Sequence, residues 1–513
     1  MMNDQTNETA RELGTEFGRR PKREPVHALG RQVAAVLELR PGELETIASA
    51  RKLPTWTSNL RVAELAVDSV ALSSLAMTLL ARDRGIAGEH RVKVDPARVQ
   101  SSFGSDRVLK VNAAAPPVWA PLSGFWRAAD GWVRTHGNYP HHAERLLTLL
   151  GLPADAEKPA VAAAIREWPR LELEDQAASA GALAIAVRDT DEWRSHPQHT
   201  FLETAPVMGF ASHGRADPRQ WRTDGGLPLS GVRVLDLTRV IAGPVATRDL
   251  ALAGAEVLRI DSPELPEPEW QHYDTGQGKR TTLLNLGDRR DSQRFERLLE
   301  DADVVVHGYR PSALAAYGLD AAALIEKHPG LVVAQLSAWG TDGPWGQRRG
   351  FDSLVQAASG IAVVESKDGG TTPGALPVQA LDHSAGHFLA AAIATALHRQ
   401  RTQGGTFAID ISLARIALAR IALALLAAGP AAQDPERSDL MQSPAKQHRS
   451  NPSQPVSGNS GVTLPSTVVP VATNSGEPLS VECAPPVLDF PGAPTGYPTP
   501  LHPWGSGPAE WSG

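Results

Sequence analysis

The chain has 513 residues, of which 42% are hydrophobic and 21% are charged, and its net charge is -7. This length supports about two to four domains with sizeable cores, and the mildly acidic balance gives no electrostatic case for a nucleic-acid partner. Cys483 is the only cysteine, so an internal disulfide is excluded and a reducing, cytoplasmic location is expected. CxxC and HExxH motifs are absent, which disfavours a catalytic metal.

The first part of the chain reads as a tail followed by a mixed region. Residues 1–25 are polar and lack the apolar segment of a secretory signal, so we expect a disordered tail. Within 26–225, the stretch 60–85 has the apolar periodicity of a long helix. The aromatic and β-branched residues of 121–137 predict two short strands, and 189–204 predicts a helix that breaks at a proline.

Residues 226–428 alternate strand and helix patterns. Apolar runs at regular intervals predict strands at 232–237, 256–261, 281–286, 303–308 and 331–337. Strands joined through helices imply right-handed crossovers, so we expect a doubly wound, mostly parallel Rossmann-like sheet. The apolar stretch 413–429 contains Arg415 and Arg420, which favours a buried amphipathic helix over a membrane span.

Two further features are the composition of the C-terminal tail and a pattern that occurs twice in the chain. Residues 429–513 are rich in Pro, Gly and Ser, so a linker that leads into an extended, surface-wrapping tail is expected. A helix–turn–strand pattern occurs at 76–95 and again at 392–410. This is either a duplication or the simple recurrence of such units in α/β proteins. In a duplication, Asp68 would correspond to Asp382 and would be vestigial.

Several charged residues stand where ligands bind such sheets, beyond the carboxyl ends of the strands. Asp382 precedes an Ala-rich helix, where it acts either as a helix N-cap or as a reactive carboxylate. The loop 238–244 lacks a GxGxxG motif but leads into a helix N-terminus that suits a phosphate. Arg310 follows the fourth strand, and Arg348 and Arg349 lie in a Gly-rich loop. Each is either a surface charge or an anion partner.

Four runs carry a resemblance to a known family. They are LSGVRVLDLTRVIAGPVATRDLALAGAEVLRID, DVVVHGYRPSALAAYGL, GFDSLVQAASG and ALDHSAGHFLAAAIATALHRQRTQGG. In order and spacing they resemble the family III CoA-transferases of the CaiB/BaiF type, which include carnitine CoA-transferase, formyl-CoA transferase and the α-methylacyl-CoA racemases. The resemblance implies a Rossmann-like domain, a smaller α+β domain and interlocked dimers. Here the segment that resembles the small domain, 121–198, comes first, so 26–225 resembles a divergent partial copy fused before the fuller copy at 226–428. Either a homodimer or an internally paired pseudo-dimer is expected.

The resemblance also implies roles for individual residues. Asp382 would be the nucleophile that accepts CoA as an aspartyl-CoA thioester, between an acyl-CoA donor and a carboxylic acid acceptor. CoA would be a substrate, with no other cofactor, no metal and no membrane involved. The positions that match CoA-contacting residues of the family are Arg239, Val240, Ile241, Ala242, Gly308, Tyr309, Arg310, Arg349, Phe351 and Asp352.

The chain departs from the family at four points. Phe351-Asp352 replaces the His-Asp pair of the racemase branch, which favours transfer over racemisation. Two family arginines fall at Ser262 and near Ala316, and the glycine-only loop of formyl-CoA transferase has no equivalent. Two alternatives therefore stay open beside the transferase, namely an acyl-CoA-binding pseudoenzyme and an α-methylacyl-CoA racemase.

Overall fold

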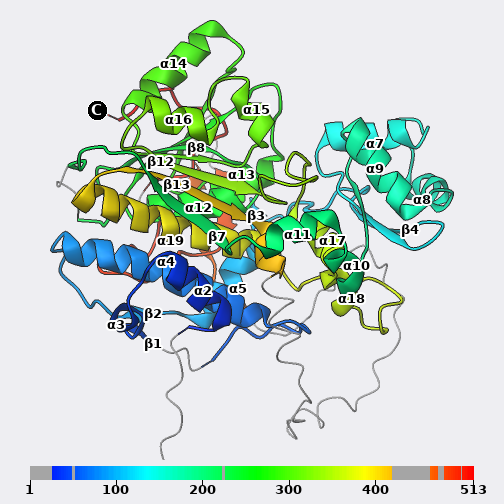
Figure 1. The fold of residues 1–513 in the computed structure, drawn as a ribbon, viewed down its shortest axis with the longest axis horizontal. Helices are drawn as coiled ribbons and strands as arrows, with labels where there is room; N and C mark the ends of the chain where they lie inside the picture. The colour runs from blue at the N-terminus through cyan, green and yellow to red at the C-terminus, as the bar shows by residue number, and fades with distance from the viewer. Residues whose placement is uncertain are drawn as a thin grey trace, which may run out of the picture.

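The computed structural model describes residues 26–48, 52–221, 226–418, 463–471, 479–497 and 499–512. Its centre is a seven-stranded sheet of order β10-β9-β8-β11-β12-β13-β7 (Figure 1). The strands are β7 (Met208–His213), β8 (Arg233–Leu237), β9 (Glu256–Asp261), β10 (Arg280–Leu283), β11 (Val304–His307), β12 (Val332–Ser337) and β13 (Thr406–Ser412). All neighbouring pairs are parallel except β13 with β7, which lies antiparallel at one edge. The prediction of a mixed α/β fold with a mostly parallel sheet is confirmed.

The strand order creates a crevice at one point of the sheet. The chain moves outward from β8 through β9 to β10, and then returns to pair β11 with the other side of β8. Crossovers therefore leave β8 and β11 toward opposite faces of the sheet, and the loops that follow the two strands separate. The residues of β11 are all buried, as expected for a strand covered on both faces.

Helices cover both faces of this sheet (Figure 1). One face carries α14 (Arg289–Glu300), α15 (Pro311–Ala315) and α16 (Ala321–Lys327). The other carries α12 (Ala242–Leu252) and α19 (Ala380–Gln403), with α4 (Val62–Asp83) and α2 (Ala28–Val36) as a further layer beneath them. Because α19 lies between the sheet and α4, it is buried on nearly every side, and its many alanines let the helices approach closely. Three short helices complete this region: α13 (Glu269–Thr275), α17 (Asp352–Ala358) and α18 (Ile361–Val364).

Helix α4 is the predicted long apolar helix. Among the described residues it is the one helix long and apolar enough to cross a membrane, but 83% of its most apolar window is buried inside the fold. Its apolar surface is therefore buried by packing against α19 and α2.

Asp68 and Asp382 both lie near the start of their helices, α4 and α19, and their positions differ by about one helical turn. The Asp68 carboxylate accepts the backbone N–H groups of His27 and Gly30 at the start of α2. Downstream of α4, the strand β2 (Val92–Lys93) pairs with β1 (Ile47–Ala48) in a separate two-stranded sheet, whereas β13 joins the central sheet. Asp68 thus stabilises a helix end.

A smaller lobe stands beside the sheet (Figure 1). It consists of β4 (Gly124–Arg127), β5 (Trp132–Thr135), β6 (Ala184–Ala186), α7 (Pro140–Leu149), α8 (Lys158–Arg166) and α9 (Arg170–Ala180). The three strands are antiparallel and share a separate hydrophobic core with the helices, so the lobe is of the α+β type. The two strands predicted within 121–137 are confirmed. Helices α10 (Thr190–Arg194) and α11 (Pro197–Glu203) connect the lobe to β7, and the predicted break at Pro197 is confirmed.

The remaining short elements are α3 (Pro41–Leu44), α5 (Pro96–Phe103), α6 (Ser105–Val108) and β3 (Lys110–Val111). The tail contributes β14 (Thr467–Val471) and β15 (Leu479–Cys483), which pair antiparallel, and β15 also pairs with β3. Further on, the N–H of Gly507 donates to Thr281 on the edge strand β10, and the Trp511 indole donates to the carbonyl of Leu298. The described part of the tail therefore covers a sheet edge that would otherwise be open.

Some predictions fall outside the described residues. These are the tail at 1–25, the linker at 429–461 and the end of the helix expected at 413–429, of which residues 413–418 are helical. The four-part domain division stays a prediction.

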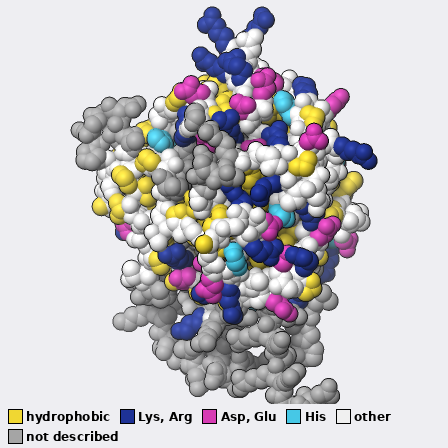
Figure 2. Space-filling view, turned by 90° about the vertical axis from the view of Figure 1, so that its left-hand side faces the viewer, with side chains coloured by type: hydrophobic (Ala, Val, Ile, Leu, Met, Phe, Trp, Pro, Cys, Tyr) yellow, Lys and Arg dark blue, Asp and Glu magenta, His cyan; other side chains and the backbone are white. Residues whose placement is uncertain are grey.

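On the face drawn in Figure 2, Lys and Arg are interspersed with Asp and Glu, so charges of both signs alternate there.

Candidate active site

A cavity of about 490 Å³ opens at the carboxyl ends of the parallel strands, against the small lobe. The loops that follow β8, β9, β10, β11 and β12 all contribute to its wall, and the start of α7 contributes from the opposite side. This is the crevice expected where the strand order reverses, which is where open α/β sheets bind their ligands.

The cavity brings most of the sequence-predicted residues together. Those that line it are Arg239, Val240, Ala242, Gly308, Tyr309, Arg310, Arg349, Phe351 and Asp382. Ile241 and Asp352 do not line it, and both are buried behind the wall. Ser262 also lines the cavity and offers no cation there.

Asp382 belongs to the first turn of α19, which begins at Ala380. The N-cap of this helix is Gln379, and no side chain caps it. Within the part of the chain that the structure describes, the Asp382 carboxylate accepts no hydrogen bond, although the residue is only 7% exposed. A capping role is therefore not supported, and the carboxylate is left free at the cavity wall.

Asp352 fills the capping role instead. Its carboxylate accepts the backbone N–H groups of Leu381 at 2.9 Å and Asp382 at 3.0 Å, and also the Gln356 side-chain amide. The assignment of Asp352 as a CoA contact is accordingly corrected to a support for the α19 N-terminus. Burial raises the pKa of Asp352 to about 6. Burial and the neighbouring Asp352 raise the pKa of Asp382 well above its usual value.

The loop after β8 is held in a strained conformation. Val240 has φ of +73°, which β-branched residues rarely adopt. Its N–H donates to Glu267 Oε1 at 2.7 Å, and the other oxygen of Glu267 pairs with the buried guanidinium of Arg259. Asp261 also pairs with Arg259 at 2.8 Å. This buried ionic cluster fixes the loop that forms one wall of the cavity.

Close backbone packing brings this loop to Asp382. Gly386 lies one turn after Asp382, and a Cβ placed there would be 2.5 Å from the carbonyl oxygen of Ala242. Glycine therefore lets α19 touch the start of α12. At the base of the same loop, buried Asp236 accepts from Thr238 N at 2.9 Å and from Lys279 Nζ at 3.0 Å, so the turn between β8 and α12 is fixed on both sides.

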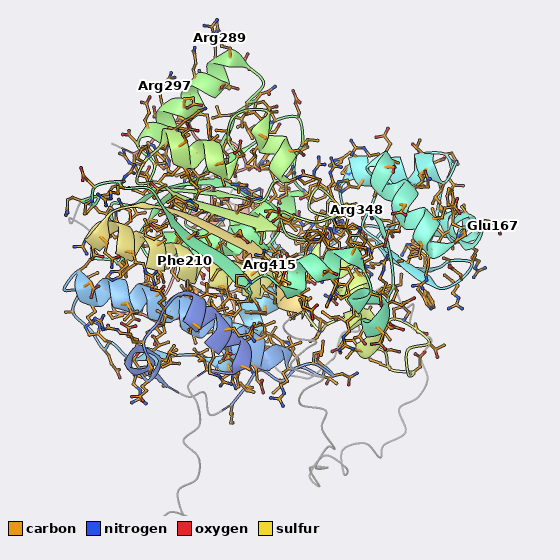
Figure 3. All side chains as sticks on the ribbon, in the orientation of Figure 1. Glu167, Phe210, Arg289, Arg297, Arg348 and Arg415 are labelled. Carbon is orange, nitrogen blue, oxygen red and sulfur yellow. The ribbon has the colours of Figure 1, made fainter. Side chains whose placement is uncertain are left out.

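One flank of the cavity is cationic. Arg239, Arg310, Arg348 and Arg349 all line it. Arg348 donates to Asp175 of the small lobe at 2.8 Å and lies between the two lobes (Figure 3). Burial, together with the charges of Arg310 and Arg145, lowers the pKa of Arg349. Closely spaced guanidinium groups of this kind suit an anionic ligand.

The small lobe supplies a wall that the sequence analysis did not identify. Tyr139, His141 and His142 line the cavity from the start of α7. Behind them, the His136 ring stacks on Phe351 with 3.7 Å between centroids and 6° between planes. Other lining residues missed from sequence are Glu264, Leu284, Asn285, Leu286, Trp339 and Leu413. The adjacent histidines after Tyr139-Pro140 were the sequence feature that could have indicated this wall. Their position beside the strand ends depends on the tertiary fold.

Comparison with known proteins identifies the sheet region. Residues 229–454 match CoA-transferase family III. A probable fatty acyl-CoA transferase of Mycobacterium tuberculosis is 32% identical over 203 residues, which is 37% of this chain and 51% of the relative. A cinnamoyl-CoA:phenyllactate CoA-transferase of Clostridium sporogenes is 34% identical over 204 residues, which is 37% of this chain and 50% of the relative.

Among solved structures, a CaiB/BaiF family protein from Brucella suis aligns with a TM-score of 0.36 and 28% identity, over 40% of this chain and 58% of that one. The chain thus spans about half the length of these curated relatives. The comparisons therefore relate the segment 229–454 to CoA-transferase family III.

Proposed function

We propose that this protein is a CoA-transferase that moves CoA between an acyl-CoA thioester and a carboxylic acid through an aspartyl-CoA intermediate at Asp382, within a Rossmann-like large domain. One observation carries the proposal. The Asp382 carboxylate has no hydrogen-bond partner in the described chain, and it shares a cavity with the arginine-bearing loops at the strand ends. Relatives named as CoA-transferases support the same reaction class.

The chemistry can be written with this chain's residues alone. An oxygen of ionised Asp382 attacks the acyl carbonyl, the C–S bond breaks, and CoA leaves as a thiolate with a mixed anhydride on the enzyme. The thiolate attacks the aspartyl carbonyl, which releases the first carboxylate and leaves an aspartyl-CoA thioester. The acceptor carboxylate attacks that thioester and displaces the thiolate. The thiolate then attacks the acceptor acyl carbon, which releases the new acyl-CoA and restores Asp382. CoA is a substrate throughout, and no other cofactor is required.

The cavity supports the binding of CoA. Arg310 and Arg349 provide positive charge for the phosphates, and the loop from Gly308 to Arg310 follows β11 at the reversal of strand order. Leu284, Leu286 and Leu336 line the cavity and suit an uncharged pantetheine arm.

Asp352 supports catalysis from behind the wall. It positions Asp382 through the backbone N–H, and its proximity raises the pKa of Asp382. A carboxylate of raised pKa is a stronger nucleophile once it is ionised.

Two further features bear on the alternatives. A racemase would need a base at the position of Phe351, whose ring is stacked on His136 and carries no titratable atom. The pseudoenzyme alternative rests on Ser262, which lines the cavity and supplies no cation for a CoA phosphate. On oligomeric state, Tyr139 and His142 of the same chain complete the cavity, which supports an internally paired arrangement.

The test is exchange of CoA in the purified full chain. Asp382→Asn should reduce transfer from acyl-CoA to a panel of carboxylic acids by at least about a thousandfold, as expected when a nucleophile is removed. The matched control is Asp368→Asn, a fully exposed aspartate on a surface loop. Full activity in Asp382→Asn would defeat the proposal, and CoA binding without turnover by the wild type would favour the binding protein.

A further inference from the structure

Gln356 is a buried amide that joins two parts of the scaffold behind the cavity. It lies on α17, one turn after Asp352, and only 2% of the residue is exposed. Its Nε2 donates to Asp352 Oδ1, and its Oε1 accepts the backbone N–H of Leu376 at 2.9 Å. Both polar ends of the side chain are therefore occupied, and Gln356 does not line the cavity.

The partner that can only donate sets the orientation of this amide. A backbone N–H has no acceptor atom, so Leu376 requires the oxygen of Gln356 and leaves the NH2 group to face Asp352. An NH2 group bonds more strongly to an ionised carboxylate than to a carboxylic acid. The contact with Gln356 therefore favours the ionised form of Asp352.

The loop that contains Leu376 leads directly into the helix that carries Asp382. It covers residues 365–379, between α18 and α19. From the small lobe, the Trp132 indole donates to the carbonyl of Thr371 in this loop at 3.0 Å. Because the small lobe holds one part of the loop and the Gln356 amide holds another, the start of α19 is fixed relative to α17.

The effect of Gln356 reaches the nucleophile through Asp352. Burial raises the pKa of Asp352 to about 6, whereas Gln356, the two backbone N–H donors and the charge of Arg134 lower it. Burial and the charge of Asp352 in turn raise the pKa of Asp382 well above its usual value. Loss of the Gln356 donor would let Asp352 hold a proton at higher pH, and Asp382 would then lose a neighbouring negative charge.

Other titratable groups around this pair are neutral or already engaged. Helix α17 packs against β5, β6, α18 and α19, and neither β6 nor α18 carries a titratable side chain. Burial keeps His383 of α19 neutral. The remaining groups nearby have other contacts in the described chain: His387 with Asp249, Arg188 with Glu174, Glu365 with Ser58 and His136 with Phe351. A change at Gln356 should therefore act on Asp382 through Asp352.

We propose that Gln356 is a positioning residue for CoA transfer, which holds Asp352 in the ionised form beside Asp382 and ties the start of α19 to the loop 365–379. The inference rests on the proposed function and adds to it the group that sets the charge state of the Asp352–Asp382 pair.

The test compares Gln356→Met with the wild type in the full chain. Methionine has a similar length but no N–H donor. The acid limb of kcat/KM, measured with one acyl-CoA and one carboxylic acid, should move to lower pH by about one unit, in the same direction as in Asp352→Asn. On the plateau above that limb, the KM for acyl-CoA should change by less than about twofold, because Gln356 does not line the cavity.

Three further variants make the result specific. Gln356→Asn keeps the amide but is one methylene too short to span both partners, so it should give the same shift and replaces Gln356→Met if that variant folds poorly. Adding Gln356→Met to Asp352→Asn should move the limb no further, because the charge through which Gln356 acts is already gone. Gln400→Met, which changes a buried glutamine near the other end of α19, is the matched control and should leave the limb in place.

A second readout needs no transfer. A water-soluble carbodiimide with an amine modifies carboxyl groups in their protonated form, and peptide mass spectrometry gives the pH midpoint of this modification at Asp382. The midpoint should fall in Gln356→Met by the same amount as the acid limb.

A limb and a midpoint that both stay in place in the folded variants would overturn the assignment, and so would an equal shift in the Asp352→Asn background. If the wild type transfers no CoA while the midpoint still falls in Gln356→Met, the proposed function fails and the control of Asp382 by Gln356 stands.

Discussion

The carboxylate of Asp352 accepts the backbone N–H of Asp382 at 3.0 Å, so two acidic residues from the starts of α17 and α19 are neighbours behind and at the cavity wall. The Asp352 carboxylate accepts hydrogen bonds from three N–H donors, whereas the Asp382 carboxylate accepts none from the described residues. This division of roles makes Asp352 a positioning residue and leaves Asp382 free to react.

The pair predicts a shift in the pH dependence of transfer. Because the negative charge of Asp352 raises the pKa of Asp382, Asp352→Asn should move the acid limb of kcat/KM to lower pH. The profile is measured with one acyl-CoA and one acid across the acidic range. Asp68→Asn is the matched control, since Asp68 also accepts backbone N–H groups but lies away from the cavity. An acid limb that stays in place in Asp352→Asn would contradict electrostatic coupling of the pair.

Asp382 should reduce stability while it supports activity. Its pKa is raised in the folded state, so the folded protein holds its proton at pH values where the unfolded chain has lost it. The stabilisation is complete below the unfolded value of 3.8 and is lost as pH rises through the folded pKa. Asp382→Asn should therefore be more stable than wild type near pH 8, by at least about 1 kcal/mol, with little difference near pH 4. Urea denaturation at both pH values measures this. A variant less stable than wild type near pH 8 would contradict the burial cost.

The strained loop depends on its ionic support. Glu267→Ala removes a buried partner of Arg259 and the acceptor of the Val240 N–H, so it should destabilise the fold by about 3 kcal/mol. Glu482→Ala, which breaks the exposed pair with Lys110, should cost less than about 1 kcal/mol. Denaturant titration of both variants gives the comparison. Equal losses would show that the Arg259 cluster does not hold the loop.

Arg349 should act on CoA binding rather than on chemistry. Arg349→Ala should raise the KM for acyl-CoA by about tenfold, since a hydrogen bond to a charged group contributes about 1.5–3 kcal/mol. The effect should shrink as salt is added. Arg194→Ala, an exposed arginine of α10 paired with Asp191, is the control. A fall in kcat at unchanged KM would place Arg349 in the reacting centre instead.

The fold was largely readable from local pattern. Runs such as Val304–His307 are short, apolar and regularly spaced. This pattern is typical of parallel strands that are buried on both faces. The strand order and the antiparallel edge strand β7 were not readable, because pairing between distant segments leaves no local signal.

The site was predicted in part for a related reason. Strand ends converge in space, so residues after different strands, such as Arg239 and Tyr309, could be grouped in advance. His142 and Tyr139 could not, because they come from a separate lobe whose placement depends on tertiary packing. Asp352 was misassigned because its sequence position adjoins the cavity while its side chain points to backbone N–H groups.

The central claim is that Asp382 carries the acyl and CoA groups during transfer. Incubation with acyl-CoA and hydroxylamine, followed by peptide mass spectrometry, tests it most directly. The account predicts a hydroxamate at Asp382 that forms only when acyl-CoA is present and is absent in Asp382→Asn. Active enzyme that transfers CoA with Asp382 unmodified under these conditions would contradict it.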